Sequence, residues 1–340
     1  MALSRCCVVI DRDAAAAHAG RSDVYRVPNR QEAAFSLKVD PEVGERIVTT
    51  KSAATWGKAA PRQGFRGVYI NLDRSTERRR NVERQLARLD LADAYLRLAA
   101  VDGRKLKPVG GLNPGIVGCF RSHVGALELA SSARGVIHIA EDDIVLSRHL
   151  APFIRHGISV GLFEDYDVVF LDLWVHPVPD LIKRYFAATE TALNHRPLDY
   201  ARFSVIDLKG TRIGAAASYV IAPSKLEKVH DLLKAELARG PTVPVDHHFS
   251  QLTDSGALRT AVMAPFLTTI DLKDGATSAT GTLPEIEHRL FLLLRQAFYV
   301  ERDLLGVVIP AMDEYRRRKV YKGLNEIRNL LAATAGIPTD

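Results

Sequence analysis

Apolar and polar positions alternate in blocks along the middle of the chain. Short apolar runs rich in β-branched residues predict buried strands over 67–74, 95–101, 136–140, 166–173 and 217–222. Between these runs, apolar residues recur with helical spacing over 75–90, from Phe120 onward and over 223–239. Strands that alternate with helices favour an α/β fold built on a parallel sheet.

The stretch Gly135–Leu146 is the centre of the functional prediction. Its predicted strand ends in three consecutive acids, Glu141, Asp142 and Asp143. Carboxylates partly removed from water need neutralisation, and their hard oxygen atoms suit Mg²⁺ or Mn²⁺, which in turn bind phosphate oxygens. We therefore predict a metal–diphosphate site with Mn²⁺ or Mg²⁺ as cofactor. The alternative is a solvated acidic turn.

Polar residues also follow the first predicted strand, at the kind of strand end where open α/β sheets bind nucleotides. Asn71, Asp73 and Arg74 come directly after the apolar run, and Arg78 lies in the first helical turn beyond them. A solvated helix face explains most of the other arginines in 75–90. Only Arg74 and Arg78 are therefore candidate site residues among them.

Two segments between these strands carry further candidates. Asp102 ends the second predicted strand, as either a ribose or base contact or a turn former. After a Pro- and Gly-rich loop at 107–115, Ser122 and His123 are expected in the first turns of a helix. A lone histidine on a helix is more often structural than catalytic. Cys119 is better explained as a small buried hydrophobe than as a nucleophile, since no base accompanies it in the sequence.

The distal half combines a predicted surface segment with a structural helix. The polar region 174–207 resembles the long loops that form acceptor sites or lids. Pro223 opens a predicted helix that ends at Gly240, with a capping-box pattern at Ser224 and Glu227.

A short acidic and histidine-containing segment follows that helix. Asp246, His247 and His248 stand between prolines and an apolar, helix-like continuation. This combination suits a general base or an additional metal ligand. Zn²⁺ suits the histidine pair less well, because no cysteine or third histidine accompanies it at ligand spacing.

Composition and charge limit the class of protein. With 340 residues, of which 47% are hydrophobic and 25% charged, the chain has the composition of an ordinary soluble globular protein of one or two domains. Its net charge of +6 favours an anionic partner. We exclude nucleic acid, because zinc-finger spacing, RNA-binding aromatics and a helix-turn-helix pattern are missing from the sequence.

Cellular location is predicted from the apolar runs and the cysteines. No apolar run approaches the roughly 20 residues that span a bilayer, and the first residues lack the apolar core of a signal peptide, so we expect a cytoplasmic protein. Cys6, Cys7 and Cys119 give neither a disulfide framework nor zinc spacing, which predicts reduced thiols.

We divide the chain into an N-terminal extension (1–62) without recognisable chemistry, a central domain (63–280) and a helical C-terminal extension (281–340). Basic residues crowd positions 316–322, at the start of the last amphipathic helix. They predict either peripheral contact with an anionic membrane surface, on the inner face of the membrane, or a packed helix with a solvated basic side.

Several short blocks taken together resemble glycosyltransferase family 25, which includes bacterial lipopolysaccharide galactosyltransferases and collagen hydroxylysine galactosyltransferases. The blocks are 68–74 with Arg78, 100–103, 118–123 and 139–143, followed by distal blocks at 210–221 and 244–246. The resemblance covers about residues 65–275. Phe120-Arg121 replaces the smaller or apolar pair expected there, and both terminal regions lie outside the shared pattern.

This resemblance implies a GT-A-type fold with a mixed, mostly parallel sheet, and an inverting hexosyltransferase. The implied donor is a UDP-sugar, usually UDP-galactose, and the implied acceptor is a glycan or glycolipid such as the lipopolysaccharide core. In that picture Asp143 binds the metal, while Glu141 or Asp142 contacts the ribose or makes a second metal contact. Asp246 is the leading candidate for the base.

The resemblance also implies a set of donor contacts. His247 or His248 would complete the metal shell, with His248 the chosen third ligand beside Asp142 and Asp143. The expected donor-binding residues are Asn71, Asp73, Arg74, Arg78, Asp102, Ser122, His123, Glu141 and Asp142.

Two other classes of function stay open. A non-catalytic nucleotide-sugar or carbohydrate-binding module with the same fold would bind a UDP-sugar without turnover. A peripheral membrane adaptor would act through the basic tail.

Overall fold

The computed structural model describes Trp56, Pro61 and residues 63–174, 179–270, 285–317, 322–334 and 336. Nearly all of the predicted N-terminal extension, 1–62, lies outside the described residues. The side chains of the basic run at 316–322 also lie outside them, so the predicted membrane contact stays a prediction.

A seven-stranded mixed sheet forms the centre of the molecule, in the order β2-β1-β3-β7-β5-β8-β6. Its strands are β1 (Phe65–Asn71), β2 (Tyr95–Ala99), β3 (Val136–Glu141), β5 (Val168–Phe170), β6 (Ser204–Asp207), β7 (Ser218–Ile221) and β8 (Thr260–Ala264). β7 runs antiparallel to β3 and β5, and β6 antiparallel to β8, while the other five strands share one direction. Strands β4 (Ile144–Leu146) and β9 (Thr268–Ile270) form a separate antiparallel pair. The chain is therefore α/β with a mostly parallel mixed sheet, as predicted.

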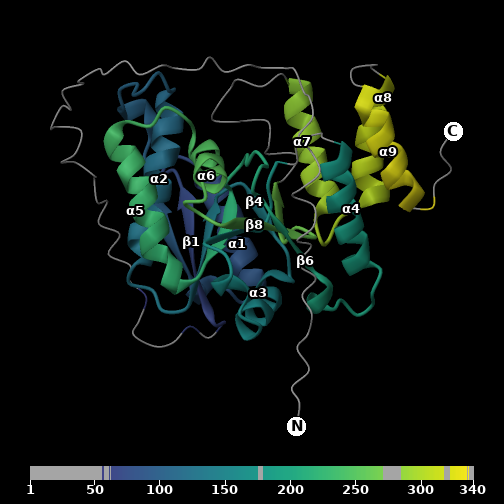
Figure 1. Ribbon diagram of the computed structural model, residues 1–340, viewed down its shortest axis with the longest axis horizontal. Coiled ribbons are helices and arrows are strands. Elements are labelled where there is room, and N and C mark those ends of the chain that lie inside the picture. Colours follow the sequence, from purple (N-terminus) through teal and green to yellow (C-terminus); the bar gives the residue numbers. More distant parts are fainter. Residues whose placement is uncertain are drawn as a thin grey trace, which may run out of the picture.

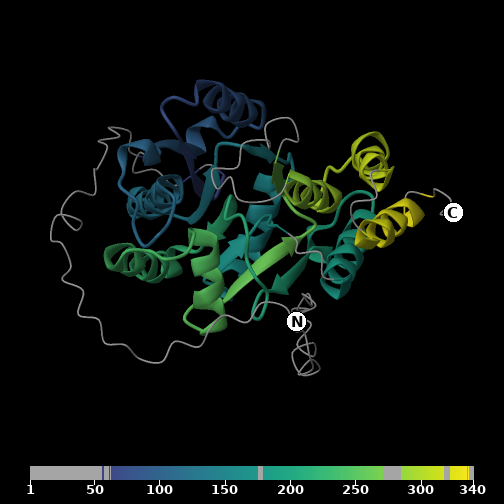
Figure 2. The same ribbon diagram turned by 90° about the horizontal axis from the view of Figure 1, so that it is seen from above.

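Helices cover both faces of this sheet. They are α1 (Thr76–Arg88), α2 (Pro114–Ala130), α3 (Leu150–Ser159), α4 (Pro179–Leu193), α5 (Pro223–Arg239), α6 (Val245–Asp254), α7 (Glu285–Phe298), α8 (Ile309–Arg317) and α9 (Lys322–Thr334). In both views α2 and α5 lie side by side at one end of the molecule, and α4, α7, α8 and α9 gather at the other (Figures 1 and 2). In the described part of the chain, no helix combines the length and apolarity required to cross a bilayer.

Alternation along the strands divides the buried side chains into two cores. In β3, Ile137 and Ile139 join the core beneath α2 and α5, whereas Val136 and Ala140 join the core beneath α1 and α3. Successive side chains of a strand point to opposite faces, so both faces of β3 must be apolar to be covered by helices. This is why β3 corresponds to a nearly continuous apolar run in the sequence.

The predicted helix over 223–239 is confirmed, but its cap is not. Leu226 and Val229 are buried, and the helix ends at Gly240 as expected. The N-cap is Ala222, because Pro223 occupies the first helical turn. Ser224 therefore lies inside the helix, and its hydroxyl donates to Glu164 Oε2 at 2.6 Å instead of capping.

One loop prediction was wrong, and another was wrong only at its last two residues, 114–115. The Pro- and Gly-rich segment 107–115 contains the start of α2, where Asn113 caps the helix by accepting from the amide of Gly115 at 2.8 Å. The region 174–207, predicted as a surface loop, contains α4 and β6. Tyr185 of α4 is fully buried. The helix was not predicted because its apolar positions at helical spacing stand among charged residues.

Helices are present in the C-terminal region, as predicted, and they pack into the main core. Leu294 and Phe298 of α7 are fully buried, and Leu331 of α9 is nearly so. These side chains belong to the same buried cluster as α2 and α5. Residues 285–298 are thus continuous with the packing of the predicted central domain.

Buried polar contacts connect side chains of β2, β3 and β7 across the sheet. Gly67 of β1 is paired with Tyr95 on one side and His138 on the other. A Cβ at Gly67 would lie 2.2 Å from the Tyr95 ring, so only glycine lets this ring cross β1. The Tyr95 hydroxyl is 2.5 Å from His138 Nδ1, and His138 Nε2 is 2.8 Å from Ser218 Oγ. Burial lowers the pKa of His138 to about 3.

His138 is therefore expected to destabilise the folded protein in acid. The unfolded chain protonates it near pH 6.5 and the folded chain only near pH 3, so stability falls as pH falls through this window. The slope from this residue is about 1.4 kcal/mol per pH unit. The free energy of unfolding, measured with urea at several pH values between 7 and 4, should fall less steeply with falling pH in His138→Asn than in the wild type. The matched control His195→Asn should keep the wild-type slope, and equal slopes in all three proteins would contradict this account.

Candidate functional site

The acidic triplet lies where the parallel strands end, next to the first predicted strand end. Glu141 is the last residue of β3, and Asp142 and Asp143 form the turn that leads into β4. β1 is parallel to β3 and ends at Asn71, with Ile70 paired to Glu141. The expected proximity of Asn71 to the acids is confirmed.

Asp142 is held by two of the predicted partners. Its Oδ2 accepts from Asn71 Nδ2 at 2.6 Å, and its Oδ1 lies 3.2 Å from the Arg78 guanidinium. Burial raises the pKa of Asp142, although Asn71 and Arg78 oppose the shift. Asn71 is itself fixed by Arg97, which donates to its Oδ1 at 2.9 Å and also pairs with Asp73 at 2.6 Å. Arg97 carries no signal in the sequence, because it lies inside a strand.

Asp143 has an oxygen that the protein leaves unpaired. Its Oδ2 lies 3.5 Å from Arg78, whereas Oδ1 is buried and accepts no hydrogen bond. Burial, with the neighbouring charge of Glu141, raises the pKa of Asp143 to about 7. The free-energy cost of burying this carboxylate is lowered either by a proton or by a bound cation.

Asp102 and Arg74 form a second cluster at the end of β2. Asp102 pairs with Arg74 and with Arg104, each at 2.6 Å, and caps the short helical turn Gly103–Lys105. Arg104 above all, followed by Arg74, holds the pKa of Asp102 well below its usual range. Asp102 therefore acts as a turn former. Asp73 is 79% exposed, and its contact with Arg97 connects it to Asn71.

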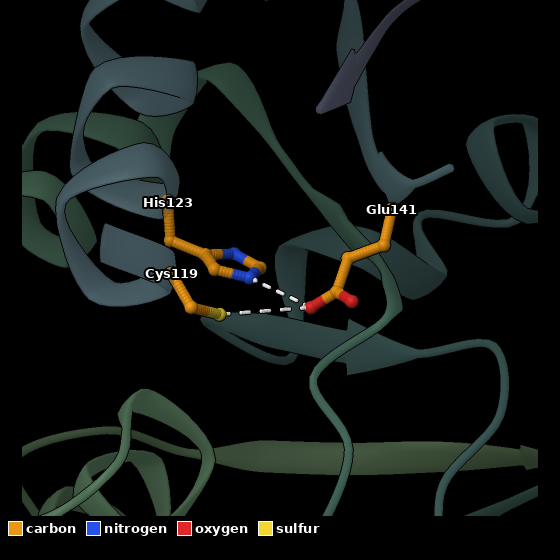
Figure 3. A group of neighbouring side chains, drawn as sticks. All are labelled: Cys119, His123 and Glu141. Carbon is orange, nitrogen blue, oxygen red and sulfur yellow. Dashed lines mark hydrogen bonds and ion pairs between the residues drawn. The ribbon is translucent and has the colours of Figure 1, made fainter. Parts of the chain in front are cut away.

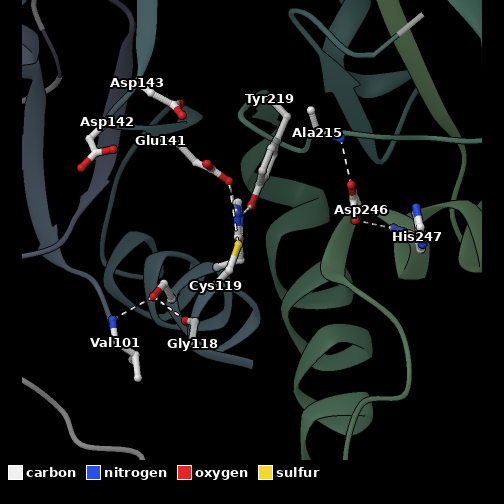
Figure 4. Close-up of polar contacts among 12 residues, drawn as sticks. Val101, Gly118, Cys119, Glu141, Asp142, Asp143, Ala215, Tyr219, Asp246 and His247 are labelled. Atoms are coloured by element: carbon white, nitrogen blue, oxygen red, sulfur yellow. Dashed lines mark hydrogen bonds and ion pairs between the residues drawn. The ribbon is translucent and has the colours of Figure 1, made fainter. Parts of the chain in front are cut away.

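Ser122 and His123 lie in the middle of α2, not in its first turns. The Ser122 hydroxyl donates to the Gly118 carbonyl at 2.7 Å and accepts from the Val101 amide at 2.9 Å (Figure 4). A Cβ at Gly118 would lie 2.6 Å from the Val101 carbonyl oxygen, so glycine allows this close approach. Ser122 is 2% exposed and holds α2 against the end of β2. This contact gives no support to its predicted role as a donor contact.

His123 connects α2 with the triplet. Its Nδ1 lies 3.0 Å from the Tyr219 hydroxyl and its Nε2 lies 3.2 Å from Glu141 Oε1. Burial opposes the ionisation of Glu141, but the contact with His123 and the charge of Arg295 outweigh it and lower the pKa of Glu141. Cys119, one turn earlier, directs its thiol toward the same carboxylate oxygen at 3.9 Å.

Cys119, His123 and Glu141 bring three potential metal ligands together (Figure 3). Their ligand atoms all lie within 4.8 Å of one another, which no other set of three His, Cys, Asp or Glu side chains achieves among the described residues. The predicted set of Asp142, Asp143 and His248 therefore does not form such a group. The missed signal was the spacing of Cys119 and His123, which share a helix face four residues apart.

His248 is buried in contacts with other residues and belongs to no compact group of metal ligands among the described residues. It is 5% exposed, its Nδ1 lies 3.3 Å from Gln251 Oε1, and its ring centroid lies 5.8 Å from that of Phe120. Residues two apart on a helix do not share a face, so Asp246 and His248 cannot both face the triplet. His247 Nε2 lies 3.0 Å from Arg212.

Asp246 is oriented by backbone amides at the start of α6. Its Oδ2 accepts from Ala215 and its Oδ1 from His247, both at 2.9 Å (Figure 4). Ala215 has a φ of 61°, a left-handed conformation that is uncommon for alanine. Burial raises the pKa of the Cys119 thiol, and the charges of Glu141 and Asp246 add to this shift. Asp246 is therefore close enough to Cys119 on α2 for its charge to act on the thiol.

A buried ion pair beside the triplet escaped the sequence analysis. Asp172, two residues beyond β5, lies 2.5 Å from Arg295 of α7, and both side chains are fully buried. Arg295 Nε and Nη1 have no hydrogen-bond partner, and the charge of Arg295 lowers the pKa of Glu141 and opposes the rise in that of Asp143. An arginine within an apolar helical stripe gives no sequence signal of its own. A residue of the predicted C-terminal extension thus neutralises the site.

Asp143→Asn is expected to stabilise the metal-free protein at pH 8. Folded Asp143 keeps its proton up to about pH 7, while the unfolded chain releases it near 3.8, so the wild type loses stability as pH rises between these values. The asparagine variant avoids this loss and should gain on the order of 2 kcal/mol at pH 8 and little at pH 4. Denaturant unfolding at both pH values measures the gain. The exposed carboxylate of Asp165 supplies the control variant Asp165→Asn, and a gain independent of pH would contradict the assignment.

Arg295→Met is expected to destabilise the fold by about 3–5 kcal/mol, because it leaves Asp172 buried without a counter-charge. The double variant Arg295→Met with Asp172→Asn removes that charge and should recover most of the loss. Urea unfolding of the two single variants and the double variant gives the coupling energy. Additive effects would show that the ion pair does not couple α7 to the sheet.

Comparisons with protein-family models and with curated proteins give no match to this chain. The resemblance to glycosyltransferase family 25 therefore stays a prediction made from the sequence.

Proposed function

We propose that the protein is an inverting glycosyltransferase that moves a sugar, with galactose favoured, from a UDP-sugar to a glycan or glycolipid acceptor. One observation carries the proposal: Asn71, Arg78, Asp142 and Asp143 meet at the carboxyl ends of parallel strands, around a buried carboxylate oxygen without a partner. Nucleotides bind at such strand ends in open α/β sheets. The mostly parallel mixed sheet is compatible with the GT-A-type fold that the resemblance implies.

Charge supports a divalent cation at this position. Glu141, Asp142, Asp143 and Asp172 face two arginines, Arg78 and Arg295, so the carboxylates outnumber the arginines in contact with them or acting on them. Asp143 fits a metal best, since its Oδ1 is unpaired, whereas both oxygens of Asp142 are occupied by Asn71 and Arg78. Mn²⁺ or Mg²⁺ bound there would supply charge to hold a diphosphate and stabilise its departure.

The chain's own residues would position the donor. Arg78 is held in place by Asp142 and Asp143, and its side chain is 26% exposed, so its guanidinium can contact a phosphate while its position is fixed. Asn71 orients Asp142, and Arg97 orients Asn71. Such pre-organisation places positive charge where the leaving group gains negative charge.

Asp246 would act as the base toward the acceptor. The acceptor hydroxyl oxygen forms a bond to the anomeric carbon, the bond from that carbon to the UDP oxygen breaks, and UDP leaves with the electron pair. Asp246 takes the hydroxyl proton. Its carboxylate is pre-oriented by the amides of Ala215 and His247, which leave one lone pair on each oxygen for the acceptor.

A specific observation favours a second candidate, a nucleotide-sugar-binding module without turnover. Both carboxylate oxygens of Asp246 already accept from backbone amides, those of Ala215 and His247, and these contacts are sufficient to explain the residue as one that fixes the start of α6.

Hydrolysis of UDP-galactose distinguishes the two candidates. Mn²⁺ is expected to stimulate hydrolysis by the wild type without any acceptor, and Asp143→Ala should lower the rate at least about 100-fold, because removing a charge-stabilising group from the transition state costs this much. Asp165→Asn serves as the matched carboxylate control and should keep the wild-type rate. UDP release is measured with UDP-galactose, UDP-glucose and UDP-N-acetylglucosamine. Binding of a donor without turnover, across a panel of glycan and lipid acceptors, would favour the module.

A further inference from the structure

Cys119, His123 and Glu141 form a compact set of sulfur, nitrogen and oxygen ligands beside the proposed donor site. Cys119 and His123 are four residues apart on α2 and therefore share a face. Glu141, at the end of β3, places Oε1 at 3.2 Å from His123 Nε2 and 3.9 Å from Cys119 Sγ (Figure 3). Two consecutive elements, α2 and β3, thus direct three ligand atoms to one point.

Two of the three distances between ligand atoms are close to those around a tetrahedral ion, and all three are within 4.8 Å. Ordinary zinc–ligand bond lengths with tetrahedral angles put nitrogen and oxygen ligands about 3.3 Å apart and sulfur and oxygen ligands about 3.5 Å apart. The nitrogen–oxygen distance of 3.2 Å already matches. The sulfur–oxygen distance of 3.9 Å is about 0.4 Å longer than the tetrahedral value.

The histidine is already oriented for coordination. Its Nδ1 contacts the hydroxyl of Tyr219, which is fully buried, and its Nε2 faces the other two ligands. Metal-bound histidines generally use their second ring nitrogen in this way, and the contact fixes the ring. His123 is itself only 1% exposed, so its orientation is determined by packing.

A nucleophilic cysteine explains this arrangement less well. The Cys119 thiol points at a carboxylate oxygen, Glu141 Oε1, at 3.9 Å. Reactive cysteines lie in electropositive surroundings, and these surroundings are electronegative. A divalent cation compensates the same field, and it displaces the thiol proton when it binds.

We propose that Cys119, His123 and Glu141 bind Zn²⁺ or a similarly soft divalent cation, at a site separate from Asp143. Thiolate and imidazole select such ions, whereas the carboxylate oxygen of Asp143 suits Mn²⁺ or Mg²⁺. Three protein ligands leave a fourth position open for water or a substrate oxygen. The Glu141 side chain is 31% exposed, which gives the ion a path to the buried thiol and imidazole.

Cadmium and zinc titrations of the full-length chain test this site. The protein used for the titrations has the substitutions Cys6→Ser and Cys7→Ser, so that Cys119 is its only thiol. One equivalent of Cd²⁺ is expected to produce the ultraviolet thiolate-to-cadmium charge-transfer band, and Cys119→Ser should abolish it. His123→Gln should weaken Zn²⁺ binding at least about tenfold by calorimetry, and Tyr219→Phe about 10–100-fold. Asp143→Asn removes a neighbouring charge without removing a ligand and should keep the band.

Loss of the band in Asp143→Asn, or its survival in Cys119→Ser, would overturn the proposal. Unchanged Zn²⁺ affinity in folded His123→Gln would do the same. Circular dichroism establishes that each variant folds. If Cys119→Ser does not fold, alkylation of Cys119 by iodoacetamide replaces it: Zn²⁺ should slow the reaction at least tenfold, and an unchanged rate overturns the site. None of these measurements depends on hydrolysis of a UDP-sugar.

Discussion

Burial of negative charge at the end of β3 is the constraint on which the rest of the site depends. Glu141, Asp142 and Asp143 follow one another where the sheet, α1 and α2 exclude much of the solvent. Carboxylates there are tolerated only if other groups neutralise them. The surrounding structure supplies Asn71 and Arg78 from the β1–α1 unit, His123 from α2 and Arg295 from α7.

Within the triplet, one buried carboxylate oxygen is left without a partner. Asp142 has partners for both oxygens, and Glu141 has His123, but Asp143 Oδ1 has none. Stable proteins rarely leave a buried charged oxygen unpaired unless a ligand completes it. The same argument explains why the fully buried Arg295, with two unpaired nitrogens, is retained beside the acids despite the cost of desolvating it.

The sequence was sufficient for the α/β class, for most strands of the sheet and for the meeting of Asn71 with the acids, because strand periodicity and parallel strand ends are local or topological properties. It was insufficient for partners that only tertiary packing brings together, such as Arg97, Arg295 and Tyr219. Helix α4 was missed because its apolar stripe is diluted by charges, and Ser122 was misjudged because α2 begins at Pro114. Strands β8 and β9 carried no motif that drew attention to them.

The triplet was predicted to lie in one metal–diphosphate site, with Asp143 on the metal and Glu141 or Asp142 on the ribose or the metal, and strand geometry divides it. Successive residues of β3 face opposite sides of the sheet, so Glu141 continues the row of Ile137 and Ile139 toward α2, while Asp142 continues the row of His138 and Ala140 toward Asn71. Glu141 consequently meets a thiol and an imidazole, and Asp142 meets an amide and a guanidinium. Acids that are neighbours in the sequence thus enter two chemical environments, one suited to the soft cation that we propose and one, at Asp143, suited to the hard cation and phosphate that we propose.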